Sequence, residues 1–252
     1  MDMNTINHRA LPEDHGPEVI RRRLEQPASR SYLGDAVLGG IDGCVTTFAI
    51  VAGSIGAGLP GLVALVLGLA NLLADGFSMG VSNYQARRAD RELLAKARRT
   101  EQRHIQVVPD GEREEVRQIF AAKGFDGDTL ERIVDTITAD QELWIATMVA
   151  EEHGLDQNPP QPWRSGVATF AAFLAVGVMP LAPLALVWFD TMLRFYISIA
   201  LAALMFLAIG MVKGRATAHS IWRSGLSTLV TGGIAAALAF GVAFGLRRAF
   251  GV

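Results

Sequence analysis

Charged and uncharged stretches are sharply separated along this chain of 252 residues, and this separation limits its possible folds more than any single motif does. Residues 36–57 and 62–81 are almost free of charge, and so are segments at about 163–187, 192–212 and 225–246. At about 1.5 Å per residue, about 20 helical residues cross a hydrocarbon core about 30 Å thick. The pattern predicts an all-α membrane protein with five transmembrane helices.

A polar insert separates the second apolar segment from the third. Residues 110–156 contain thirteen acidic and four basic residues, a local charge of −9. Apolar residues recur here in three groups at helical spacing, which predicts three amphipathic helices in water. We expect Asp128 to cap the helix that contains Leu130, with Glu131 in the capping-box position. The second apolar helix has no breaker at its end and is expected to continue into residues 87–103.

Four residues of the first two apolar segments could line an ion pathway: Asp42, Asn71, Asp75 and Met79. Counting from the helix ends places Asp42, Asn71 and Asp75 at similar depths. A carboxylate inside the bilayer costs at least ~2.5–3.5 kcal/mol, so an ion or proton pathway is the default explanation. The alternative is an acid near the interface that snorkels or bonds to a neighbouring helix. Met79 is either core packing or a soft thioether ligand one turn from Asp75.

Three groups of polar residues in the insert are spaced so that each group shares one helix face. Glu-x-x-His beside Glu-x-x-Glu is typical of carboxylate-bound iron or manganese in helical bundles, and these donors suit divalent first-row metals. The alternative is a solvated acidic face. The groups are Glu101 and His104; Glu112 and Glu115; and Met148, Glu151 and Glu152.

These features divide the chain into a polar N-terminal tail (1–31), two transmembrane helices (32–87), a helical metal-binding domain (88–157) and three further transmembrane helices (158–252). The Gly39-Gly40 and Gly232-Gly233 pairs predict close helix approach. The single cysteine, Cys44, excludes an internal disulfide and a cysteine-based zinc site, and packing is its expected role. No nucleophile–base, phosphate-binding or nucleic-acid motif is found, so we expect a secondary transporter and not an enzyme.

Orientation follows from the basic residues. Residues 21–23, residues 87–103 and the connection between the fourth and fifth segments are rich in Lys and Arg, and all three lie on one side in a five-span arrangement. The positive-inside rule makes that side cytoplasmic, which places the N-terminus and the insert there. Arg247 and Arg248 at the other end of the chain run against the rule.

Three stretches resemble the vacuolar iron transporter family, which includes a yeast transporter that complements calcium sensitivity. They are LGGIDGCVTTF (38–48), GLANLLADGFSMG (68–80), and ITAD (137–140) leading to MVAEE (148–152). With the order of two spans, an insert and three spans, the resemblance covers about residues 32–250. Its last three spans match mainly in hydropathy.

The resemblance implies proton-coupled export of divalent iron, often also manganese, from the cytoplasm by a homodimer whose pathway lies at the subunit interface. It assigns the pathway to Asp42 and Met79. The chain departs from the family pattern at His104, where glutamate is usual, and at Val149, where a second methionine is common. The implied metal ligands are Glu101, Glu112, Glu115, Met148 and Glu152.

The expected partners are therefore protons, the lipid bilayer, a second copy of the chain and transported Fe²⁺ or Mn²⁺, with Zn²⁺ and Co²⁺ as further candidates. No permanently bound cofactor and no nucleic acid are expected. The Arg/Ala-rich composition favours a bacterial plasma (inner) membrane.

Two other functions remain open from the sequence. The protein could be a membrane-anchored metal sensor or buffer through which nothing passes. It could also be a ferritin-like iron-binding oxidase, since Glu101-Gln-Arg-His104 mimics a di-iron motif. That fold needs four helices with two such motifs, and the insert has room for three.

Overall fold

The computed structural model describes residues 16–25, 32–217 and 220–251, and the chain divides into two compact units after Ser31. The first unit contains helix α1 (Pro17–Glu25), in which Glu18 and Arg21 form an ion pair of 2.7 Å. This short helix was not predicted within the polar tail. The other tail residues, 1–15 and 26–31, lie outside the described part of the chain.

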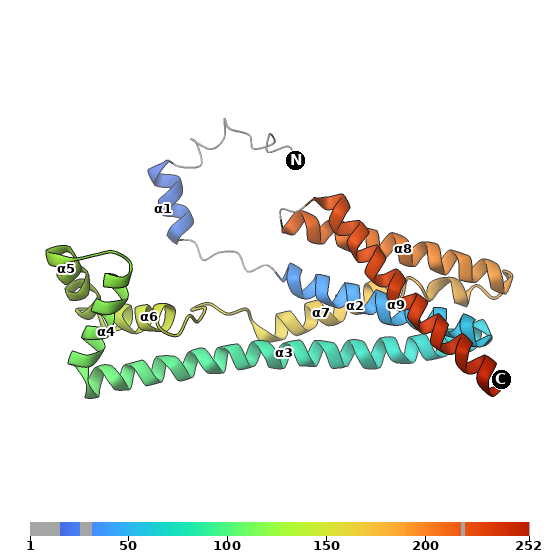
Figure 1. Ribbon diagram of the computed structural model, residues 1–252, viewed down its shortest axis with the longest axis horizontal. Helices are drawn as coiled ribbons and strands as arrows, with labels where there is room; N and C mark the ends of the chain where they lie inside the picture. The colour runs from blue at the N-terminus through green and yellow to red at the C-terminus, as the bar shows by residue number, and fades with distance from the viewer. Residues whose placement is uncertain (1–15, 26–31, 218–219, 252) are drawn as a thin grey trace. The chain divides into compact units, whose positions relative to one another are not determined.

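In the second unit, Tyr32–Val252, all the regular secondary structure among the described residues is helical (Figure 1). Its elements are α2 (Leu33–Ala57), α3 (Gly61–Val107), α4 (Pro109–Ala122), α5 (Gly127–Thr138), α6 (Gln141–Glu151), α7 (Pro162–Gly177), the short 3₁₀ helix η2 (Ala182–Ala185), α8 (Thr191–Ala216) and α9 (Ile221–Phe250).

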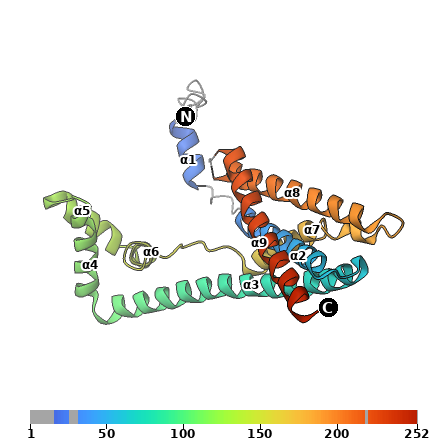
Figure 2. The same cartoon turned by 45° about the vertical axis from the view of Figure 1, so that its right-hand side comes forward.

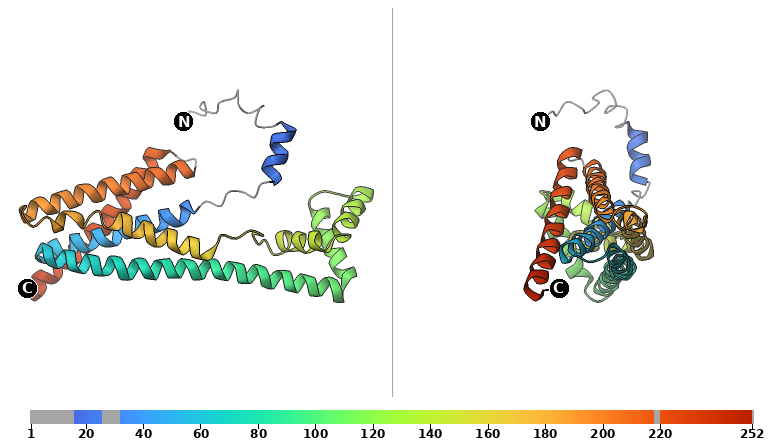
Figure 3. Two further views of the ribbon diagram at one scale, coloured as in Figure 1. Left: turned by 180° about the vertical axis from the view of Figure 1, so that it is seen from behind. Right: turned by 90° about the vertical axis from the view of Figure 1, so that its right-hand side faces the viewer.

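Helix α3 connects the two parts of this unit. Its 47 residues extend about 70 Å, more than twice the thickness of a hydrocarbon core. The apolar half packs against α2 and α7, and the polar half contacts α4 and α6. Figures 2 and 3 show α4, α5 and α6 gathered at the C-terminal end of α3, with α2, α7, α8 and α9 near its other end. The predicted continuation of the second apolar helix is confirmed.

Four helices among the described residues are long and apolar enough to cross a membrane: α2, α3, α8 and α9. Large apolar side chains such as Phe77 on α3 and Leu238 on α9 stay exposed, as expected for surfaces that face lipid. Helix α7 has only 16 residues, about 24 Å, and gives way to turns and η2 around Pro180 and Pro183. Proline lacks the backbone N–H that continues a helix, so the predicted break is confirmed.

Glycines on α2 allow α7 to approach closely. A Cβ atom added at Gly39 would lie 2.1 Å from the Thr169 carbonyl oxygen, and one at Gly43 would lie 2.4 Å from the Phe173 carbonyl oxygen. A Cβ at Gly232 would collide with the Phe206 ring, whereas Gly233 faces open space. Close approach is thus confirmed at Gly39 and Gly232. Cys44 is fully buried in an apolar cluster, as its predicted packing role requires.

Helices α4, α5 and α6 are the three helices predicted between residues 110 and 156. They enclose an apolar core that includes Val116, Val134 and Trp144, and Ile105 of α3 packs against it. Four helices therefore meet here, because the end of α3 joins the three predicted ones.

The predicted cap of α5 is wrong. Asp128 already lies inside the helix, and the residue at the N-cap is Asp126, which has an extended backbone. The side chain that does cap a helix in this region is Asp140 at the start of α6, which accepts hydrogen bonds from the N–H groups of Glu142 and Leu143. An Asp close to a helix start does not by itself identify the first helical residue.

Candidate metal centre

The turn between α3 and α4 brings two carboxylates and an imidazole together. Pro109 occupies the first position of α4, where its missing N–H costs nothing, and the chain folds back over the end of α3. Glu101 and Glu112 are nearly inaccessible, with 1% and 2% of their surfaces exposed. The ligating atoms of Glu101, His104 and Glu112 all lie within 4.8 Å of one another, and His104 Nδ1 is 3.1 Å from Glu112 Oε1.

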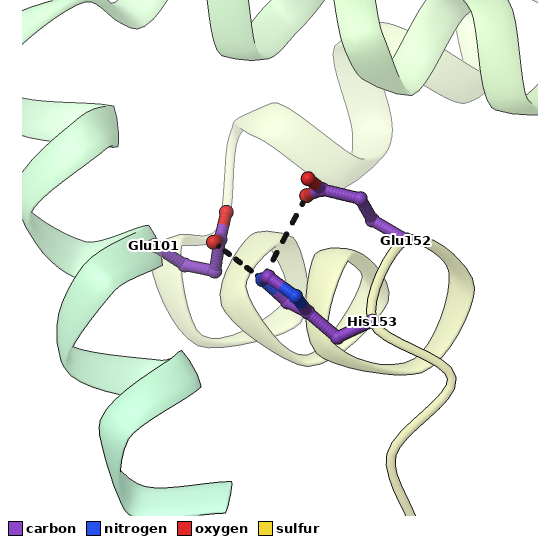
Figure 4. Close-up of side chains that lie close together, drawn as sticks. All are labelled: Glu101, Glu152 and His153. Atoms are coloured by element: carbon purple, nitrogen blue, oxygen red, sulfur yellow. Dashed lines mark hydrogen bonds and ion pairs between the residues drawn. The ribbon is translucent and has the colours of Figure 1, made fainter. Parts of the chain in front are cut away.

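The end of α6 brings a second group to the same Glu101 (Figure 4). His153 follows the last residues of α6, and its Nε2 lies 2.8 Å from Glu101 Oε1 and 3.9 Å from Glu152 Oε2. The ligating atoms of Glu101, Glu152 and His153 also lie within 4.8 Å of one another. Glu101 therefore belongs to two possible metal-binding groups, one completed by α4 and the other by α6.

One oxygen of each buried carboxylate lacks a hydrogen-bond donor among the described residues. Glu101 Oε2 and Glu112 Oε2 are inaccessible and have no hydrogen-bond partner in the described part of the chain. A buried carboxylate oxygen without a donor costs at least about 1–3 kcal/mol, so such a pair calls for a cation or a proton.

Two arginines of α4 form ion pairs outside the centre. Arg113 pairs with Asp135, and Arg117 pairs with Glu131 at 2.8 Å. These two guanidinium groups are paired with carboxylates that belong to neither metal-binding group.

The surroundings of these groups favour their protonated forms. Burial, followed by the charges of Glu101 and Glu115, raises the pKa of Glu112 to about 7. Burial and the Glu101 charge raise the pKa of Glu152. The hydrogen bond with Glu101 raises the pKa of His153, although burial opposes it. A metal ion that bound here would displace these protons, so its binding would depend on pH.

Three other predicted ligands lie around these two groups. Glu115 is exposed, but its charge acts on both Glu112 and Glu152. Met148 is fully buried in the α4–α6 core. Glu151 pairs with Lys123 and belongs to neither group. Val149, the residue that replaces a methionine of the family pattern, is also fully buried.

The four residues predicted to line a pathway are all half-buried, with Asp42 on α2 and the other three on α3. The carboxyl groups of Asp42 and Asp75 lie within electrostatic range of each other. Asn71 is one turn before Asp75 on α3. Met79 packs against an apolar cluster that includes Phe173, so core packing accounts for part of its surroundings.

Sequence reasoning missed two features. One is His153, which comes after α6 and shares no helical spacing with the other ligands, so no pattern in the sequence indicates it. Asp35 is a buried acid, with 5% of its surface exposed, that accepts hydrogen bonds from Asn83 at 3.0 Å and Arg87 at 3.3 Å. Its one signal in the sequence is an acid at the start of an apolar segment, which is also typical of an exposed first turn.

Known proteins are similar to this chain in sequence along most of its length. The VIT family matches residues 33–244. The chain is 33% identical over 211 residues to "vacuolar iron transporter 2" of Oryza sativa subsp. japonica, which covers 83% of this chain and 85% of the relative. It is 30% identical over 245 residues to "vacuolar iron transporter" of Toxoplasma gondii, which covers 93% of this chain and 79% of the relative. The matched residues include the apolar helices and the region of the candidate centre, and the chain therefore belongs to the vacuolar iron transporter (VIT) family.

Proposed function

We propose that this protein exports divalent iron, manganese or both from the cytoplasm in exchange for protons. Relatives named vacuolar iron transporters support the substrate class. The observation that carries the proposal is the pair of buried carboxylates, Glu101 and Glu112, whose inner oxygens have no donor in the described residues. They lie at the end of α3, the helix whose other half carries Asp75 and Met79.

In this proposal the chain crosses the membrane five times, through α2, the apolar half of α3, α7 with the irregular residues after it, α8 and α9. Residues 88–157 form a cytoplasmic metal-binding domain, and the N-terminus lies on the same side. Two copies form a homodimer whose interface contains the pathway. The membrane is the bacterial inner membrane.

Transport begins with capture of the metal by the proposed ligands Glu101, His104, Glu112, Glu115, Met148 and Glu152, with Glu151 at the edge of the centre. The negative charge of the region concentrates cations there. The ion then passes to Asp42 and Met79, beside Asn71 and Asp75. Protons from the opposite side compete for the same carboxylates and release the metal, since a carboxylate cannot hold both.

The decisive experiment is uptake into proteoliposomes with an imposed pH gradient, measured for Fe²⁺, Mn²⁺, Zn²⁺ and Co²⁺. Asp42→Ala should reduce transport to the background rate and leave metal binding at the centre intact. Glu142→Gln is the matched control, because this exposed carboxylate pairs with Arg98 outside both groups. Loss of binding in Asp42→Ala would contradict separate capture and transport sites. Binding without flux in the wild type would favour a membrane-anchored sensor or buffer.

A ferritin-like iron-binding protein is the second candidate, because the end of α3 and α4–α6 supply four helices around the centre. The chain contains one Glu-x-x-His motif, at Glu101 and His104, where such proteins use two. We expect no catalysed oxidation of Fe²⁺ in the presence of oxygen, and sustained turnover in a ferroxidase assay would favour this candidate.

A further inference from the structure

We propose that His153 is a metal ligand, and that its imidazole, with that of His104, makes the centre prefer Fe²⁺, Co²⁺ and Zn²⁺ over Mn²⁺ and Mg²⁺. This inference rests on the proposed function, because it assigns the class of ion that the same centre captures.

The geometry around His153 matches that of ligands to one ion. Two ligand atoms that are each about 2.1 Å from an ion lie about 3.0 Å apart at right angles and about 4.2 Å apart on opposite sides. His153 Nε2 is 2.8 Å from Glu101 Oε1 and 3.9 Å from Glu152 Oε2 (Figure 4). The 3.1 Å from His104 Nδ1 to Glu112 Oε1 matches the same right-angle spacing.

An ordinary ion pair does not account for the whole cluster. Each imidazole approaches one oxygen of a buried carboxylate, His153 that of Glu101 and His104 that of Glu112. The other oxygens of these carboxylates, both Oε2 atoms, are inaccessible and have no donor among the described residues. Negative charge of Glu101 and Glu112 therefore remains unbalanced inside the cluster even when both imidazoles are engaged. In this proposal a divalent cation balances it.

The backbone fixes His153 in place before any ion arrives. Its N–H donates to the Met148 carbonyl at 3.3 Å, and the N–H of Leu155 donates to the Val149 carbonyl at 3.1 Å. Gly154 between them has φ of 62°, a left-handed conformation that favours glycine. A ligand held by a helix C-terminus in this way loses little conformational freedom on binding.

The chemical type of the ligand atoms determines which ions bind more tightly. Imidazole nitrogen suits iron, zinc and their neighbours, whereas Mg²⁺ and Mn²⁺ prefer sites made of oxygen alone. With two nitrogen donors, one in each group around Glu101, both metal positions would discriminate against Mg²⁺, the abundant competitor that an all-carboxylate centre rejects poorly.

The test is X-ray absorption at the zinc K-edge on the purified full-length protein, because imidazole gives a characteristic outer-shell scattering. His153→Gln and His104→Gln should each reduce this scattering by about half, and the double variant should abolish it. Affinities for Zn²⁺ and Co²⁺ should fall about tenfold for each histidine, while the Mn²⁺ affinity changes less than about threefold. Glu142→Gln is the control for a polar change at an exposed position outside both groups.

His153→Glu provides a second variant, because it exchanges a nitrogen donor for an oxygen donor and keeps a ligand. It should retain binding and shift preference towards Mn²⁺. Unchanged imidazole scattering in His153→Gln, or equal losses of Zn²⁺ and Mn²⁺ affinity, would overturn the proposal. Failure of the wild type to bind any of these ions would instead overturn the proposed function, and the wild-type titration separates the two results.

Discussion

At the scale of single residues, the metal centre places carboxyl groups where their charge is costly. Burial and two neighbouring carboxylates raise the pKa of Glu112 from 4.5 to about 7. Between these values the folded protein holds a proton that the unfolded chain has released. The stability of the metal-free protein must then fall as the pH rises through this window. The raised pKa values of Glu152 and His153 act in the same direction.

We therefore expect the metal-free wild type to unfold at a higher temperature at pH 5.5 than at pH 8 when heated with a chelator. Glu112→Gln should make this pH dependence shallower and raise the melting temperature at pH 8, because it removes the like-charge repulsion. Glu142→Gln should keep the wild-type slope. A wild type that is more stable at pH 8 would contradict the raised pKa of Glu112.

At the scale of elements, helix α6 is capped at its start by one side chain, and its other end carries two residues of the candidate centre. Asp140 satisfies two N–H groups at the start of α6, and the opposite end of this helix carries Glu152 and His153. Asp128 lies in the first turn of α5 and is not its cap residue. These two aspartates thus separate the effect of a cap from that of a charge near a helix start.

Asp140→Ala should lower stability by about 1 kcal/mol and weaken metal binding, because α6 begins less firmly. Asp128→Ala should change stability by no more than about 0.5 kcal/mol and leave binding unchanged. Thermal unfolding and metal titration of both variants check this. Equal effects of the two substitutions would show that the capping bonds of Asp140 do not position the ligands.

Backbone contact between α2 and α7 gives a second expectation at this scale. Gly39→Ala places a methyl group against the Thr169 carbonyl, and such overpacking costs about 1–3 kcal/mol. Gly34, on the same helix, has no atom near its Cβ position, so Gly34→Ala is the control. The apparent melting temperature in detergent should fall by about 4–8 °C for Gly39→Ala and stay within about 2 °C for Gly34→Ala. An unaffected Gly39→Ala would mean that the two helices separate easily.

At the scale of the whole molecule, the number of membrane crossings depends on α7. The helix itself is shorter than a hydrocarbon core is thick, and the turns after it contain Pro180 and Pro183. Irregular backbone at membrane depth is tolerated where protein surrounds it, and Leu181 and Leu184 are buried in the apolar core. These contacts support a complete crossing by α7 together with η2.

Labelling of single introduced cysteines tests this crossing without removing the native cysteine, because Cys44 is fully buried. Exposed positions are available at Glu142 on α6, Arg215 at the end of α8 and Arg248 on α9. Five crossings predict that Glu142→Cys and Arg215→Cys react with a membrane-impermeant maleimide from one side and Arg248→Cys from the other. Reaction of Glu142→Cys and Arg248→Cys from one side and of Arg215→Cys from the other would mean that α7 turns back within the membrane.

The amino-acid sequence alone determined which segments are helical and which are apolar. Hydropathy and helical spacing depend on residues close together in the chain, so the continuous α3, the break near Pro180 and the helices α4–α6 could all be predicted. The proximity of Glu101 to His104 and Glu112 could also be predicted, because a single turn separates α3 from α4.

Only the tertiary structure decided which distant residues meet. Glu101 and His153 are 52 positions apart, and Asp35 and Arg87 are also 52 apart, so no local pattern relates them. The pairing of Glu151 with Lys123, outside both possible metal groups, likewise depends on how α4 and α6 pack. Side-chain packing between helices fixes these contacts, since it brings together atoms whose distance along the chain carries no periodic signal.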